Sequence, residues 1–139
     1  MTFRRAIVAV IVALASGLAL HSCVKPRSFE EFIPSSKAAD GVYVFEFEME
    51  DTLSTYDFEF YTRVDGPQLD SLPLKVMWLA PSGESFSETV YMDPSVLVEP
   101  YRTGVQPSQA GLWRICVRPG TSSGAFRGLG MICRENGTR

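Results

Sequence analysis

Carboxylates are the residues of this sequence whose types and spacing come nearest to a catalytic device. Glu46 and Glu48 are two residues apart, as are Asp57 and Glu59, and both pairs lie where apolar residues alternate. Side chains at i and i+2 of a strand share a face, so each pair points one way. Glycosidases use two carboxyl groups about 5 or about 6.5–9.5 Å apart, one with a pKa raised by burial. Nothing indicates an apolar pocket around these acids, so the pattern favours a solvated outer face.

Histidine and thiolate chemistry have little support. The only histidine, His21, precedes a predicted cleavage site, so imidazole-based catalysis and His-based zinc or copper sites are excluded from the processed chain. Cys116 and Cys133 form no Cys-x-x-Cys motif. The segment from Asp65 to Asp70 lacks the close acid spacing of an EF-hand loop, which leaves calcium a weak alternative. We predict no catalytic residue, no metal ligand and no cofactor.

The N-terminus has the three parts of a secretory signal peptide. Arg4 and Arg5 give a positive start, an apolar run covers residues 6–20, and Leu-His-Ser-Cys occupies positions 20–23. The apolar run is shorter than the ~20 residues that span a bilayer as a helix. It is therefore predicted to be a signal for export and not a permanent anchor.

The end of this signal resembles the lipobox of bacterial lipoproteins. Leu20, Ser22 and Cys23 match its aliphatic, small and obligatory cysteine positions, while His21 departs from the usual Ala, Ser or Thr. Each buried acyl methylene contributes ~0.8 kcal/mol and two chains hold a protein stably, so a diacylglycerol on the Cys23 sulfur suffices as an anchor. The alternative is an ordinary signal peptide in which Cys23 falls by chance.

The predicted organisation is a signal peptide over residues 1–22, a lipidated tether over 23–38 and one domain over 39–139. Three apolar tether residues are available to dock onto the domain: Phe29, Phe32 and Ile33. Loss of the signal leaves 11 basic residues against 16 acidic ones, a formal charge of −5. That charge argues against nucleic-acid binding.

Apolar and polar residues alternate along most of the domain, which is typical of strands with one buried face. The turn over residues 81–84 predicts a hairpin, and the segment from Asp93 to Gly111 is predicted to be a loop. Some six short strands without a helical stretch predict an all-β fold, an antiparallel β-sandwich or jelly-roll-like domain. For the aromatic residues, core is favoured over a carbohydrate-stacking platform: Tyr43, Phe45, Phe47, Phe58, Phe60, Trp78, Phe86 and Trp113.

Cys116 and Cys133 remain as an even pair once Cys23 is acylated, in a compartment that permits disulfides. Each lies in an apolar stretch, and the two stretches look like consecutive strands. A cross-strand disulfide is therefore open to them. The alternative is two buried thiols, because cysteine is among the most often buried residues.

Several segments, taken in order, resemble the gliding-motility lipoprotein GldH family of Bacteroidota. They are residues 45–52, 56–60 with Arg63, 74–78, the turn at 80–84, 88–90, 109–113 and 128–132. The chain departs from the family pattern after Met92, where a shorter loop stands. The resemblance implies an envelope component related to gliding or type IX secretion machinery. It carries over no catalytic residue.

Function is therefore expected to lie in binding. A non-enzymatic, membrane-anchored envelope lipoprotein is the favoured hypothesis, and a small carbohydrate-binding or calcium-dependent module is the alternative. Leu97, Val98 and Tyr101 are the candidate contacts for other envelope proteins, unless their loop folds back onto the domain. By the resemblance, the basic segment 24–27 after Cys23, which contains Lys25 and Arg27, favours a domain that faces the periplasm.

Replacing Cys23 with alanine should abolish lipidation, because no other residue of the motif can form the thioether. Labelling of cells with a clickable palmitate measures this, with His21→Ala as the matched control that keeps the cysteine. Equal labelling of the Cys23→Ala variant and the wild type would contradict the predicted anchor.

Overall fold

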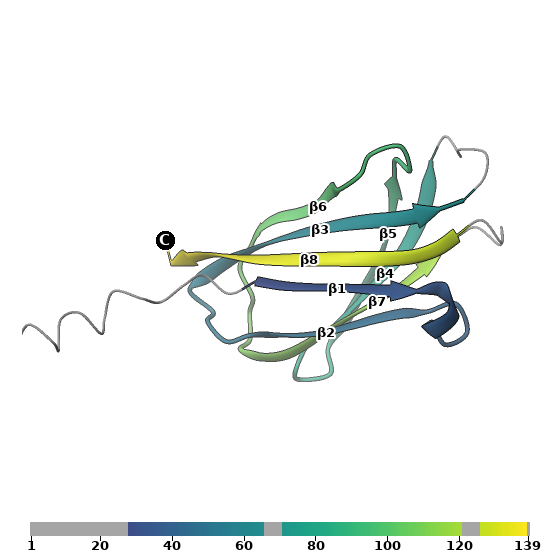
Figure 1. Cartoon of the computed structure of the whole chain (residues 1–139). Helices are drawn as coiled ribbons and strands as arrows, with labels where there is room; N and C mark the ends of the chain where they lie inside the picture. The colour runs from purple at the N-terminus through teal and green to yellow at the C-terminus, as the bar shows by residue number, and fades with distance from the viewer. Residues whose placement is uncertain (1–27, 66–70, 121–125, 139) are drawn as a thin grey trace, which may run out of the picture.

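The chain forms a sandwich of two antiparallel sheets with four strands each (Figure 1). The structure is a computed structural model, and it describes residues 28–65, 71–120 and 126–138. One sheet has the strand order β1-β8-β3-β6 and the other β2-β7-β4-β5. The elements are β1 (Ser28–Pro34), η1 (Ser35–Lys37), β2 (Tyr43–Met49), β3 (Ser54–Val64), β4 (Leu72–Leu79), β5 (Ser85–Met92), β6 (Glu99–Val105), β7 (Gly111–Pro119) and β8 (Phe126–Thr138). The predicted antiparallel β-sandwich is confirmed.

The predicted hairpin is the connection between β4 and β5. The Gly83 N–H donates to the Ala80 carbonyl at 2.9 Å, and the Ala80 N–H donates to the Glu84 carbonyl at 2.8 Å. Gly83 has φ +91°, the left-handed conformation that a three-residue hairpin loop needs after its type I turn. The two strands then pair without interruption from Leu79 opposite Ser85 onward.

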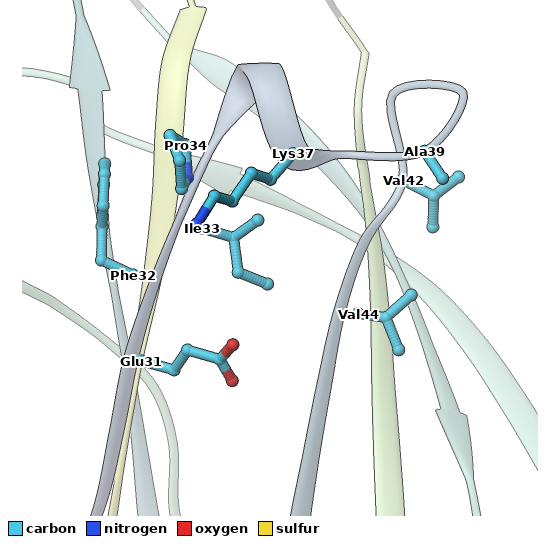
Figure 2. A pocket seen from close by; sticks show the side chains of 8 residues that line it. All are labelled: Glu31, Phe32, Ile33, Pro34, Lys37, Ala39, Val42 and Val44. Carbon is cyan, nitrogen blue, oxygen red and sulfur yellow. The ribbon is translucent and has the colours of Figure 1, made fainter.

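The first strand shows that the predicted tether boundary is wrong. β1 pairs antiparallel with β8 in a register that begins with Ser28 opposite Arg134. Phe29 and Ile33 of this strand pack against the core, as docking residues should. With η1 and the segment leading to β2, β1 borders a cleft of about 390 Å³ (Figure 2). The domain therefore includes residues 28–38, because the long strand β8 pairs its backbone groups with β1 on one side and with β3 on the other.

Glycines on β8 let two aromatic rings approach the outer face of that strand. A Cβ atom at Gly128 would lie 2.3 Å from the Phe32 ring, and one at Gly130 would lie 2.0 Å from the Tyr61 ring. These two rings stack on each other with centroids 5.9 Å apart. Phe32 thus holds β1 from outside, while Phe29 and Ile33 hold it from the core side.

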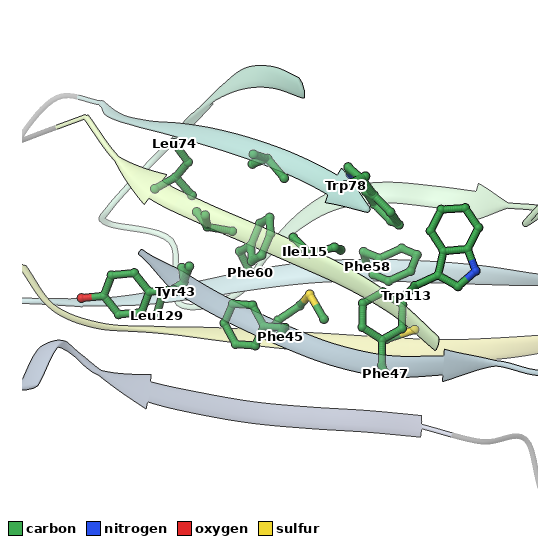
Figure 3. Packing of buried hydrophobic residues seen from close by; sticks show 14 of the residues in the cluster. Tyr43, Phe45, Phe47, Phe58, Phe60, Leu74, Trp78, Trp113, Ile115 and Leu129 are labelled. Atoms are coloured by element: carbon green, nitrogen blue, oxygen red, sulfur yellow. The ribbon is translucent and has the colours of Figure 1, made fainter. Parts of the chain in front are cut away.

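The core is a layer of aromatic and aliphatic side chains between the sheets (Figure 3). Phe58 of β3 has its ring centroid 5.5 Å from that of Phe47 on β2 and 5.0 Å from that of Trp78 on β4, so rings from both sheets meet. The predicted aromatic core is confirmed for all its members except Phe86, which is 48% exposed. Phe86 faces inward from β5, but β5 is an edge strand and leaves one side of the ring uncovered.

The segment from Asp93 to Gly111, predicted to be a loop, contains a strand. β6 pairs with β3 across two register shifts, at Phe58 and its neighbours. Pro100 and Gly104 lie within this strand and hide its period from sequence reading. The prediction was therefore wrong for residues 99–105 and right for the loop at 93–98.

A chain that starts at Ala39 should be less stable than one that starts at Val24. It lacks β1, so Phe29 and Ile33 no longer cover the core, and burial of such side chains contributes ~1.5–3 kcal/mol each when complete. We expect a loss of about 2–4 kcal/mol in urea unfolding. Equal midpoints for the two chains would show that β1 adds nothing to the domain.

Candidate functional site

One open side of the sandwich lies between the edge strands β5 and β6, and a polar cluster spans it. The Tyr101 hydroxyl donates to Glu88 Oε1. Arg102 donates from Nε to Glu88 Oε1 at 3.0 Å and from Nη2 to Oε2 at 2.7 Å. Trp78 Nε1 donates to the Tyr101 hydroxyl at 2.9 Å. We call Glu88, Tyr101 and Arg102 the edge clamp, because they join the two sheets.

The electrostatics of the edge clamp stabilise one protonation state. Burial raises the pKa of Glu88, but the hydrogen bonds from Tyr101 and Arg102 outweigh this effect and lower it below 4.5. Burial and the hydrogen bond to Glu88 raise the pKa of Tyr101 to about 12. At neutral pH the carboxylate is ionised and the phenol protonated. A lowered carboxyl pKa is the opposite of what a general acid needs, so this arrangement suits a structural clamp.

A cavity of about 200 Å³ lies beside the edge clamp. Apolar side chains line most of it, together with three polar ones: Met49, Trp78, Phe86, Val105, Pro107, Trp113, Arg102, Gln106 and Ser108. Sites for drug-sized ligands measure ~300–1,000 Å³. This smaller cavity therefore has room for a single side chain or ring.

The structure separates the three predicted contact residues. Leu97 is 86% exposed and Val98 37% exposed, and both lie in the loop between β5 and β6. Val96, in the same loop, is 42% exposed. Tyr101 instead lies in β6, with its ring centroid 4.8 Å from that of Phe60. Its assignment as an exposed loop residue was wrong, because the chain has already entered the sheet at Glu99.

The local chemistry of the loop at 93–98 explains its shape. The Asp93 carboxylate accepts hydrogen bonds from the backbone N–H of Ser95 at 2.9 Å and from its hydroxyl at 2.6 Å. The Asp93 N–H in turn donates to Glu99 Oε2 at 2.8 Å. These bonds fix both ends of the loop. The apolar residues between them are left pointing to solvent.

Of the two alternatives left open for the cysteines, the structure does not show the disulfide. Both are free thiols, with Cys116 on β7 and Cys133 on β8. These strands are consecutive in the chain but belong to different sheets. Cys133 faces the core, where burial raises its pKa to about 12, whereas Cys116 alternates with the buried Ile115 and Val117 and so faces outward. The alternative of a buried thiol holds for Cys133.

One carboxylate pair lies on a solvated face, as the alternation indicated, whereas Asp57 and Glu59 face away from the core but are half-buried. Glu46 and Glu48 are exposed on β2, and Glu46 forms a 2.6 Å ion pair with Arg114. Asp57 accepts a hydrogen bond from the Gly104 N–H at 2.7 Å. Among residues 28–65, 71–120 and 126–138, no group of three or more His, Cys, Asp or Glu side chains could hold a metal ion.

Two of the predicted features fall at least partly outside the described residues. Cys23 precedes them altogether. Of the segment 65–70, weighed above as a weak calcium alternative, only Asp65 is described, and its Oδ2 forms a 2.8 Å ion pair with Arg127 Nε. Within the described ranges, no helix has the length and apolar character needed to cross a membrane.

The edge clamp is a feature that the sequence analysis missed. Glu88 lies on the same face of its strand as Phe86, Val90 and the buried Met92. The sequence therefore places a charged residue at an inward-facing position. That pattern indicates a buried partner, since an inward charge on an edge strand must be paired. The partner itself was hidden, because Tyr101 and Arg102 lay in the segment predicted to be a loop.

The fold and these contacts define an antiparallel β-sandwich in which the Glu88–Arg102 ion pair and the hydrogen bonds of Tyr101 join one open side. No family model matches the chain, and no curated protein matches it. The resemblance to the GldH family therefore stays a prediction.

Glu88→Gln should make the protein less sensitive to acid. The folded-state pKa of Glu88 is lowered, so its contribution to stability is present above about 4.5 and is lost as the pH falls through the folded-state value. We expect the variant to melt about 4 °C lower than the wild type at pH 6, and this difference should narrow as the pH is lowered from 6 toward 3. Glu48→Gln, on the exposed face, is the control. A constant difference across this pH range would contradict the role given to the carboxylate.

Proposed function

We propose that this protein is a non-enzymatic lipoprotein of the bacterial cell envelope that binds another envelope protein at the end of its sandwich distant from the membrane. The observation that carries the proposal is the exposed apolar loop at 93–98, with Leu97 86% exposed. Buried apolar anchors surrounded by polar groups account for most of the energy of protein interfaces.

The position of this loop relative to the anchor supports the proposal. β1 starts at the end of the sandwich where β8 finishes, because Ser28 pairs with Arg134 (Figure 1). β5 runs toward the other end, where Met92 pairs with Leu72 at the start of β4. The loop after Met92 thus leaves the sandwich at the end opposite to Ser28.

The short distance along the chain from Cys23 to Ser28 limits how far the start of β1 can lie from the anchor. Five extended residues span at most about 17 Å. A lipid on Cys23 would therefore hold the start of β1 near the membrane surface, since Ser28 already belongs to the sheet. When the sandwich stands upright on this anchor, the loop at 93–98 lies at the end away from the membrane, where it can meet other envelope proteins.

The resemblance to the GldH family adds the cellular context. We propose a component related to gliding or type IX secretion machinery, with the domain facing the periplasm. Protease added to intact cells should then leave the domain uncut, whereas digestion would place it on the cell surface.

Leu97→Asp should weaken partner binding without changing the melting temperature. The side chain is 86% exposed and adds little to the core, while an anchor at an interface contributes ~1–4 kcal/mol. Quantitative crosslinking in intact cells should show a loss of about fivefold or more in recovered envelope proteins.

Leu53→Asp is the matched control for this experiment. Leu53 is 66% exposed but lies between β2 and β3, at the end of the sandwich where β1 starts. Its substitution should leave recovery unchanged. Equal losses for the two variants, or none for Leu97→Asp, would contradict the proposed contact.

A further inference from the structure

The two sheets leave four edge strands, and three of them carry features that oppose the addition of another strand. β1 contains Pro34 and two exposed glutamates. β6 contains Pro100 and Gly104 and has irregular register. β2 presents exposed Glu46 and Glu48. Proline, charge and irregular pairing are the usual devices that protect sheet edges.

β5 lacks these devices. Its sequence, SFSETVYM, has no proline, glycine, lysine or arginine, and its pairing with β4 has no register shift. Its one charged residue, Glu88, points inward but is already paired with Arg102. In the described part of the chain, no strand pairs with its other side.

Specific backbone groups of β5 face this free edge. In an antiparallel pair, alternate residues exchange both hydrogen bonds with the partner strand, and the residues between them point their groups away. The Ala80 N–H donates to the Glu84 carbonyl, so Glu84 belongs to a hydrogen-bonded pair. Every second residue after it, namely Phe86, Glu88 and Val90, therefore directs its backbone groups toward β4. The N–H and C=O groups of Ser87, Thr89 and Tyr91 therefore face outward.

We propose that the free edge of β5 binds an extended peptide segment of another envelope protein as an added strand. This inference rests on the proposed function and names its binding mode. Only an extended backbone matches the repeat of free donors and acceptors. Its inward side chains would lie beside Phe86, which is 48% exposed, and one of them can enter the neighbouring cavity of about 200 Å³.

Two features of the molecule favour a peptide over a second copy of this chain. Symmetric pairing of two β5 strands is antiparallel and turns one sandwich end for end relative to the other. The two Ser28 residues then lie at opposite ends of the pair. Segments of about 17 Å from Cys23 to Ser28 can bring both lipids to one membrane only if both sandwiches lie flat on it. In addition, the edge is continuous with the exposed loop at 93–98, so one extended partner can contact both surfaces.

Peptide display on the soluble chain from Val24 onward tests the proposal. Random peptides as long as β5, eight residues, are selected on the wild type and on two variants at the edge. Thr89→Pro removes an outward N–H and should reduce binding of the selected peptides about tenfold or more. Thr89→Ala keeps that N–H and should bind like the wild type. Ser87→Pro replaces Thr89→Pro if the latter lowers the melting temperature.

Two readouts identify the mode of binding. Amide hydrogen exchange at Ser87, Thr89 and Tyr91 should slow when a selected peptide binds, and Phe86→Ala should weaken the same peptide several fold. Failure to enrich peptides beyond the Thr89→Pro selection, or equal binding by the two Thr89 variants, would overturn the proposal. A dimer in sedimentation that Thr89→Pro abolishes would assign the edge to a second copy instead. Because the soluble chain has no lipid, none of these results depends on the anchor, which palmitate labelling tests separately.

Discussion

Contact between aromatic rings of opposite sheets is the interaction on which the rest of this domain depends. Phe58 comes from the sheet that holds β1, whereas Phe47 and Trp78 come from the other sheet, and their centroids lie 5.0 to 5.5 Å from that of Phe58. Packing of such rings adds ~0.5–1.5 kcal/mol per pair beyond the burial of their area. The layer they form sets the distance between the sheets and so positions every loop and edge.

A sandwich of this kind has two open sides between its edge strands, and in this protein the two sides differ in how they are closed. On one side, β1, η1 and the segment into β2 leave a shallow cleft with charged Glu31 and Lys37 at its border (Figure 2). On the other side, the edge clamp joins β5 to β6 through Glu88. An ion pair that is partly exposed adds little stability by itself. Its more important effect here is to pair the inward-facing carboxylate of Glu88 on an edge strand.

The N-terminal strand connects the proposed anchor to the body of the domain. β1 is held by β8 through its backbone, by the core through Phe29 and Ile33, and by Tyr61 through Phe32. A force applied at Cys23 would therefore be transmitted through β1 to β8. A flexible tether up to residue 38 would have left the orientation of the sandwich undefined. With β1 in the sheet, the exposed loop at 93–98 instead has a fixed position relative to Ser28, at the opposite end of the sandwich.

The sequence alone was sufficient for the class of fold and for most of the core. Strict alternation in residues such as Phe45, Phe47 and Ile115 identifies buried faces, because side-chain direction in a strand repeats every two residues. The turn at Gly83 was equally readable, since its conformation requires a particular residue type. The solvated position of Glu46 and Glu48 followed from the same period.

Tertiary structure decided the features that depend on which strands become neighbours. Consecutive strands β7 and β8 separate into different sheets, so Cys116 and Cys133 are apart although their segments adjoin. β1 and β6 were missed because their sequence patterns are short and irregular. Pairing with β8 and β3 stabilises these two strands, and the local sequence period carries no signal of such distant partners. By itself, the sequence determined a β-sandwich with an alternating core, and it predicts export from the motif that ends at Cys23. The order of the strands, the pairing of Glu88 with Arg102 and the free edge of β5 arose only from the packing of two sheets, because each depends on contacts between segments far apart in the chain.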